Sequence, residues 1–283
     1  MNTFDSNRFS KALKCAFMVS RKSWIRLFGI FTLVMFMANL FWTRVQGVSY
    51  QHMVESDMYN MTDVYNRYNV YVEQSVAFGI IFFCVAMLFA ASYMFSQMKD
   101  TRKRSAYLLW PVSNLEKYIS SFLLSFVLTA VLTVGAFVLA DALRVLVDWL
   151  TGRIVIWGIP KLGKLYEPAE SWHMYWMLST WAFYVHSLYI VGGTLFRRQQ
   201  FLLTSATIAV VGILLIMLLN QFNPQFDFIT GTWDEKTYTY TRTFHPSFYI
   251  INSVLNVLIV FHYWLSYKLF CRMQVINNKW LNV

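Results

Sequence analysis

Charged residues are scarce in this chain of 283 residues: Lys, Arg, Asp and Glu make up 13% of it, whereas hydrophobic residues make up 57%. Soluble domains carry about 25% charged residues, so this chain has too little charge to cover a water-exposed surface of ordinary size. The scarcity excludes a soluble secreted protein and a disordered one. The net charge of +10 is scattered between long apolar runs and is not gathered on one module, which argues against a nucleic-acid partner.

Six stretches lack Lys, Arg, Asp and Glu altogether, and each is 17 to 23 residues long. A helix needs about 20 residues to cross about 30 Å of hydrocarbon, where a spanning backbone must be helical or a closed barrel. Because these stretches show no period-2 alternation, we predict an all-α integral membrane protein with six transmembrane helices. The six stretches are 27–43, 74–96, 118–140, 172–194, 201–220 and 247–267.

The segments between these stretches differ in positive charge. Alternate segments hold 16 Lys and Arg in one set and 8 in the other. The positive-inside rule therefore places the richer set, and with it both termini, in the cytoplasm. The predicted organisation is a cytoplasmic or interfacial helix at 1–26, a transmembrane domain at 27–270 with outer loops at 44–73, 141–171 and 221–246 and a cytoplasmic loop at 97–117, and a cytoplasmic tail at 271–283.

Residue patterns for enzyme chemistry are also lacking. The sequence has no G-x-S-x-G, no H-E-x-x-H and no G-x-x-x-x-G-K-[ST] pattern, and its three cysteines show neither metal-ligand spacing nor a pair on the outer side. We therefore predict no catalytic, cofactor-binding or metal-binding residue on this chain. No carboxylate lies within a predicted span, although ion-driven transporters usually bury carboxylates there. If the protein moves a substrate against a gradient, the energy must come from another polypeptide.

Residues 8–24 form an amphipathic helix when they are placed at 100° per residue. An apolar arc and a basic arc oppose each other, a pattern typical of a helix that lies on the membrane surface and is attracted to anionic lipid. The helix either anchors the chain to membrane lipid or also touches a partner. The defining residues are Phe9, Leu13 and Phe17 on the apolar arc and Lys11, Lys14 and Arg21 on the basic arc.

The loop 97–117 carries an apolar cluster beside a basic run. Ser113 and Glu116 have the spacing of a capping box, and Pro111 disfavours helix through Trp110, so we expect a helix to begin near Ser113 and to continue into the third span. The apolar residues Leu108, Leu109, Trp110 and Val112 either dip into the membrane interface or fit a groove on a partner.

Small and polar residues within the spans predict helix packing. Ser121, Ser125, Thr129 and Thr133 recur every four residues on one helix face, which favours close helix approach, although a polar permeation path is the alternative. Asn252 and Asn256 share a face as well and favour hydrogen bonds to neighbouring helices over substrate binding. His186 and His262 favour hydrogen bonds between helices over a proton relay, because no carboxylate lies within a predicted span to pair with them.

Two features are expected on the outer side. Asp141, Arg144 and Asp148 predict a helix that continues beyond the membrane, with an exposed ion pair that contributes a few tenths of a kcal/mol. Residues 221–246, with Pro224, Gly231 and Pro246, could form a short re-entrant element.

The stretch LLWPVSNLEKYISSF at 108–122, together with six spans and an amphipathic helix before the first, resembles the membrane subunits of ABC-2 type transporters. The resemblance implies a permease homodimer or heterodimer in a prokaryotic inner membrane. It also implies a separate ABC ATPase subunit that binds ATP and Mg²⁺ and receives the loop between the second and third spans. The implied coupling residues are Leu108, Leu109, Trp110, Pro111, Val112, Ser113, Asn114, Glu116 and Lys117.

Three hypotheses for function follow. The first is the permease subunit of an ATP-driven ABC exporter, which is not itself an enzyme. The second is a non-transporting scaffold or sensor that recruits a cytoplasmic partner through loop 97–117. The third, an intramembrane enzyme that uses His186 or His262, has the weakest support.

Overall fold

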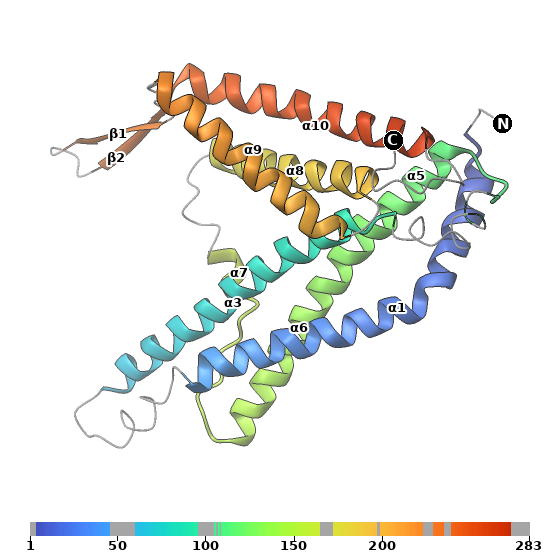
Figure 1. The fold of residues 1–283 in the computed structure, drawn as a ribbon. Coiled ribbons are helices and arrows are strands. Elements are labelled where there is room, and N and C mark those ends of the chain that lie inside the picture. The colour runs from blue at the N-terminus through green and yellow to red at the C-terminus, as the bar shows by residue number, and fades with distance from the viewer. Residues whose placement is uncertain are drawn as a thin grey trace. The chain divides into compact units, whose positions relative to one another are not determined.

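The computed structural model describes residues 4–45, 60–95, 105, 107, 109–164, 172–196, 199–222, 229–234 and 239–272 (Figure 1). Leu108, part of each outer loop and the tail after residue 272 lie outside the described residues. The chain divides into two compact units. Unit 1 comprises residues 1–90 and 115–170, and unit 2 comprises residues 91–114 and 171–283.

Within the described residues, five helices are long and apolar enough to cross a membrane, as expected for a multi-pass membrane protein. They are Ser6–Arg44, Met61–Ser92, Asn114–Leu150, Gln200–Leu218 and Pro246–Arg272. The predicted span 172–194 is also helical, in α8 (Trp172–Leu195), but its Trp, Tyr, His and Gly residues make this helix less apolar than the other five. Six spans therefore stay a prediction.

In unit 1, α1 (Ser6–Leu40) joins the predicted interfacial helix and the first span into one helix, which ends in the π-helical turn η1 (Phe41–Val45). Asp5 caps its start by accepting hydrogen bonds from the backbone N–H groups of Asn7 and Arg8. The helix bends in its first half (Figure 1). Ser20 donates to the carbonyl of Ala16 at 2.7 Å, a side-chain bond of the kind that bends helices.

The second and third spans of unit 1 are longer than predicted. Helix α3 (Met61–Ser92) begins well before residue 74, because Asp63, Arg67 and Glu73 are compatible with a helix although they are charged. Helices α5 (Asn114–Leu123), η4 (Leu124–Leu128, π-helical) and α6 (Thr129–Leu150) are continuous, and we refer to them as the 114–150 helix. At 1.5 Å per residue it is about 55 Å long, well over the thickness of the hydrocarbon core.

The core of unit 1 lies where α1, α3 and the 114–150 helix meet. It contains Met35, Val76, Ala136, Phe137 and Ala140, and Phe28, Phe31 and Phe82 are among the side chains that pack around it. A Cβ placed on Gly79 would lie 2.8 Å from the ring of Phe137, so the absence of a side chain at residue 79 brings α3 close to α6. The short helix α7 (Lys161–Lys164) follows α6.

In unit 2, α8 packs against both α9 (Gln200–Phe222) and α10 (Pro246–Arg272). In the sequence, β1 (Ile229–Asp234) and β2 (Thr239–Phe244) lie between α9 and α10. The two strands pair antiparallel, with Ile229 opposite Phe244 and Asp234 opposite Thr239. Part of 221–246, the segment for which the sequence suggested a re-entrant element, is thus a two-stranded hairpin. The other elements of the described residues are helices.

Candidate functional sites

The predicted coupling segment forms a turn that leads directly into α5. Leu109 donates its N–H to the carbonyl of Ser105 at 3.0 Å, and Val112 donates to the carbonyl of Trp110 at 2.8 Å across Pro111. This short-range bond holds a tight turn at the proline. Pro111 and Asn114 are exposed, whereas Trp110, Val112 and Ser113 are half-buried, and α5 begins at Asn114, next to the expected Ser113.

The exposed end of this turn is apolar. The Leu109 side chain is 81% exposed, the largest exposed fraction among the exposed large hydrophobic side chains of the described residues. The buried side chain of Tyr107 packs against this turn and braces it. Its ring centroid lies 5.5 Å from that of Trp110 and 6.4 Å from that of Phe270 on α10. A leucine held outward on a braced turn is suited to insertion into a pocket on a partner or into the membrane interface.

Glu116 and Lys117, at the end of the predicted coupling set, are buried. The Glu116 carboxylate accepts hydrogen bonds from the Arg8 guanidinium, with Nη2 at 2.8 Å and Nε at 3.0 and 3.2 Å from its oxygens, and from the backbone N–H of Asp5 at 2.9 Å. The first turn of α1 is thus joined to the first turn of α5. The capping-box pattern pointed to Glu116 as a helix-start residue, but nothing local pointed to Arg8 as its partner.

The N-terminal half of α1 exposes its basic side chains, whereas its apolar arc is only partly buried. Lys11, Lys14 and Arg21 are exposed, and Phe9 and Leu13 are half-buried beside the buried Ala12 and Ala16. Phe17, although it lies on the apolar arc, is 41% exposed. The helix therefore presents basic side chains together with an exposed aromatic ring, an arrangement that suits an anionic lipid surface.

The row of small residues in the third span faces inward in part. Ser125, Thr129 and Thr133 are buried and Ser121 is half-buried. Ser125 donates to the carbonyl of Phe122 and Thr133 to that of Thr129, so these two hydroxyls are satisfied within their own helix. The π-helical turn at 124–128 interrupts the regular spacing of the row. The hydroxyls of Ser125 and Thr133, bonded in this way, suit helix packing, whereas the buried Thr129 hydroxyl oxygen has no hydrogen-bond partner among the described residues.

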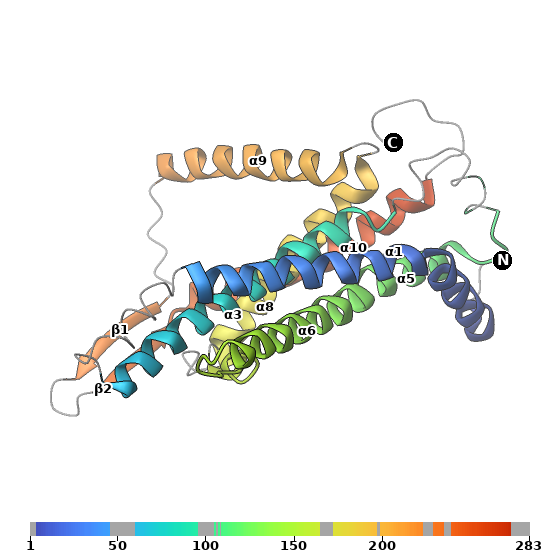
Figure 2. The same ribbon diagram turned by 90° about the horizontal axis from the view of Figure 1, so that it is seen from below.

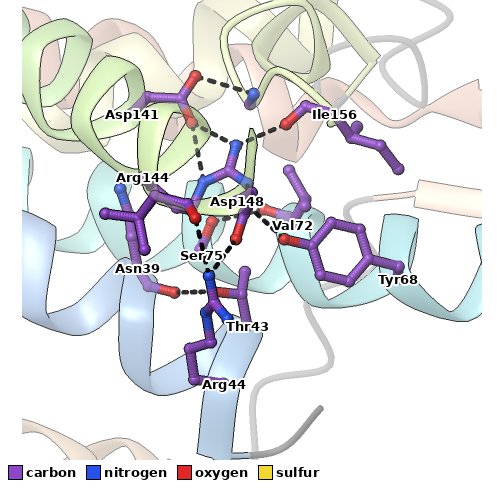
Figure 3. Close-up of polar contacts among 12 residues, drawn as sticks. Asn39, Thr43, Arg44, Tyr68, Val72, Ser75, Asp141, Arg144, Asp148 and Ile156 are labelled. Atoms are coloured by element: carbon purple, nitrogen blue, oxygen red, sulfur yellow. Dashed lines mark hydrogen bonds and ion pairs between the residues drawn. The ribbon is translucent and has the colours of Figure 1, made fainter. Parts of the chain in front are cut away.

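A cluster of charged groups lies at the C-terminal end of α6, where the sequence predicted an exposed ion pair (Figure 3). That prediction is wrong about exposure, because Arg144 and Asp148 are 0% exposed and Asp141 is 1% exposed. Arg144 donates to Asp141 at 2.7 Å, to Asp148 at 2.9 Å and to the carbonyl of Ile156 at 2.6 Å. The segment after α6 folds back over these side chains and removes them from solvent.

Two residues from other helices complete this cluster, which we call the Arg144 network: Arg44, Tyr68, Asp141, Arg144 and Asp148. The Tyr68 hydroxyl on α3 donates to Asp148 at 2.5 Å, and Arg44 of η1 donates to Asp148 at 3.0 Å. Asp141 also accepts from the backbone N–H of Gly158 at 2.9 Å. Each carboxylate thus has several donors, as a buried charge requires.

In unit 2 the helices are joined by neutral polar side chains. His186 and Ser187 on α8 lie 3.0 Å from Tyr263 and His262 on α10, respectively. The same two helices are also joined where Asn256 on α10 donates to Thr180 on α8 at 3.2 Å. Asn252, in contrast, donates to the carbonyl of Phe248 in its own helix. Both histidines therefore serve as contacts between helices, the role that the sequence favoured over a proton relay.

The turn between α8 and α9 is held by close contacts. Gln200 donates to the carbonyl of Gly193 at 2.7 Å, and a Cβ on Gly193 would lie 2.5 Å from the carbonyl oxygen of Ser92. Gln199 has a positive φ of 47°, which lets the chain reverse at this point. Arg197 and Arg198, which lie in this turn, are outside the described residues.

Comparisons of this chain with protein-family models, with curated protein sequences and with solved structures gave no match.

Proposed function

We propose that this chain is the transmembrane subunit of an ATP-driven exporter of the ABC-2 type. ATP and Mg²⁺ would bind to a separate ATPase subunit, and two permease subunits, identical or related, would form the translocation unit in the inner membrane of a prokaryote. Both termini and the coupling segment would face the cytoplasm. This chain would carry no catalytic residue of its own.

One observation carries the proposal: an exposed apolar residue stands on a braced turn immediately before a long continuous helix. Leu109 is 81% exposed, and the 114–150 helix begins five residues later. A partner that grips Leu109 and Trp110 would act directly on the end of a helix that is long enough to cross the membrane. Such a lever is what a permease without an internal energy source needs.

The test is affinity purification of the tagged chain from its native membrane in mild detergent, followed by identification of bound proteins and measurement of ATP hydrolysis. We expect an ATPase subunit with the wild-type chain, and loss of that subunit with the Leu109→Ala, Trp110→Ala double variant. Leu150→Ala is the matched control, because Leu150 is also an exposed leucine, at 67%, but lies at the other end of the 114–150 helix.

The outcome separates the proposal from its alternative. A bound partner that does not hydrolyse ATP would favour the scaffold or sensor instead. A chain that purifies without any ATPase subunit would overturn the exporter proposal.

A further inference from the structure

Helix α1 and the 114–150 helix run side by side in the same direction (Figure 2). Two ion pairs join them, and these pairs lie at opposite ends of both helices. Arg8 meets Glu116 near the first residues of each helix, and Arg44 meets Asp148 near the last. Between these ends, Met35 packs with Ala136 and Phe137 in the core of unit 1.

The contact at the first end is specific in geometry. Arg8 reaches both oxygens of Glu116 with two of its nitrogens, an arrangement that fixes orientation as well as distance. Because the Glu116 carboxylate is fully buried and also accepts the N–H of Asp5, it faces the interior of unit 1. Glu116 is therefore better placed to hold α1 than to touch a partner, which changes the role that the ABC-2 resemblance implies for it.

The contact at the second end is equally specific. A single nitrogen of Arg44 donates to Asp148 at 3.0 Å, to the carbonyl of Val147 at 3.3 Å and to the hydroxyl of Thr151 at 2.8 Å. Asp148 is held in turn by Arg144 and Tyr68, so Arg44 binds to a site that is already fixed. The Arg44 side chain itself is 23% exposed and stands at the edge of the network.

We propose that Arg8 and Arg44 are positioning residues that pin α1 to the 114–150 helix at both ends and make the two helices one rigid strut. When the coupling segment is displaced, the C-terminal end of α1 then moves together with the C-terminal end of α6. The source of that displacement rests on the proposed function. The rigidity of the strut does not, because it follows from contacts within unit 1.

Rigidity is tested by double electron–electron resonance on the full chain in lipid nanodiscs. Cys15, Cys84 and Cys271, which are free, are replaced by serine, and spin labels are attached at Phe41→Cys and Leu150→Cys, where both native side chains are exposed. We expect one narrow distance distribution for the wild-type pair, and a broadened or split distribution after Arg44→Gln. Arg44→Gln removes a side chain at the edge of the network and leaves Asp148 with Arg144 and Tyr68, so the fold should persist.

The matched control is Arg26→Gln, an arginine on the same helix that donates to the carbonyl of Lys22 in its own helix. Its distance distribution should equal that of the wild type. An unchanged distribution in Arg44→Gln would overturn the strut, whether or not an ATPase subunit exists.

Transmission is tested on the complex with its co-purified ATPase subunit, trapped with MgATP and vanadate. One spin label is attached at Val210→Cys, where the native side chain is exposed on α9, and the other at either Phe41→Cys or Leu150→Cys. The distance between the two labels is measured with and without nucleotide. In the Arg8→Gln, Arg44→Gln double variant, we expect the nucleotide-dependent shift at Phe41 to be lost, while the shift at Leu150 and ATP hydrolysis remain. A general loss of structure would remove both shifts.

Restoring a positive charge at both pins should then restore the response. The single variant Arg8→Lys, in which Arg44 is wild type, keeps a positive charge near Glu116. It should recover the shift at Phe41. A shift at Phe41 that persists in the double variant would overturn transmission through the pins. Failure to obtain any ATPase subunit would overturn the proposed function instead, and it would leave the nanodisc result to stand by itself.

Discussion

The two units join their helices with different chemistry. In unit 1 the ends of the helices are connected by Arg, Asp and Glu, in the Arg144 network and in the Arg8–Glu116 pair. In unit 2, α8 is connected to α9 and α10 by His, Tyr, Ser, Asn and Gln side chains and by contacts at glycine. Among the described residues, the charged contacts of unit 1 lie near helix ends, whereas the neutral contacts of unit 2 lie both along α8 and α10 and at the turn between α8 and α9.

The difference follows from the cost of burying charge. An ionised group within hydrocarbon is expensive even when it is paired, whereas a neutral hydrogen bond between helices is tolerated there and contributes modestly. A helix of about 55 Å, such as the 114–150 helix, extends beyond the hydrocarbon and can carry charged contacts at its ends. Unit 1 can therefore hold its helices by a few directional contacts, and unit 2 must rely on close packing.

The largest effect is expected from the centre of the Arg144 network. Arg144→Met leaves two buried carboxylates without their main cation, and removal of one partner from a buried pair costs about 3–5 kcal/mol. We expect a loss of that order in the free energy of unfolding, measured by circular dichroism during titration with SDS in mixed micelles.

A triple variant sharpens this prediction. Asp141→Asn, Arg144→Met and Asp148→Asn together remove the three buried charges of α6 and leave only that of Arg44, whose side chain is 23% exposed. They keep acceptors for the N–H of Gly158 and the hydroxyl of Tyr68. Because buried ion pairs replaced as a set are often neutral in stability, the triple variant should unfold later than the single one. If it is no more stable than Arg144→Met, the loss does not come from unpaired charge.

The apolar runs of the sequence located the helices because the requirement for uncharged residues in a bilayer is local. The ends of the helices were harder to predict, since Asp63, Arg67 and Glu73 are compatible with a helix outside the hydrocarbon. A start near Ser113 was predictable from Pro111 and Ser113, because capping is also a local effect.

The burial of charge could not be predicted in the same way. The spacing of Asp141, Arg144 and Asp148 indicates one helix face, but an exposed face and a buried face have the same spacing. The partners that decide the matter, Tyr68 and Arg44, lie 80 and 104 residues away from Asp148. Arg8 and Glu116 are also far apart in the sequence, separated by 108 residues. Only the three-dimensional structure brings these groups together.

In unit 2 an intermediate effect is expected at the close contact of Gly193. Gly193→Ala would place a Cβ 2.5 Å from the carbonyl oxygen of Ser92 and 3.1 Å from that of Ala91, and both are backbone atoms that cannot turn aside. Overpacking of this kind costs about 1–3 kcal/mol. The same SDS titration should show earlier unfolding.

Gly212→Ala is the control for this substitution. Gly212 lies in α9, and apart from its chain neighbours and the adjacent backbone of its own helix no atom lies within 4 Å of the added Cβ. The better helix propensity of alanine should therefore leave stability unchanged or raise it by up to about 1 kcal/mol. Equal losses of stability in Gly193→Ala and Gly212→Ala would show that the close approach of α8 to the backbone of Ala91 and Ser92 is not what holds unit 2.

The smallest effect is expected from a single neutral hydrogen bond of unit 2, between Asn256 on α10 and Thr180 on α8. Such bonds between membrane helices average about 0.6 kcal/mol in double-mutant cycles. We expect a coupling energy of that size from Asn256→Ala, Thr180→Ala and the double variant, because each helix also finds partners for these groups in the unfolded state. A coupling energy as large as the loss in Arg144→Met would erase the contrast between the units, since a neutral contact would then hold its helices as firmly as the charged ones do.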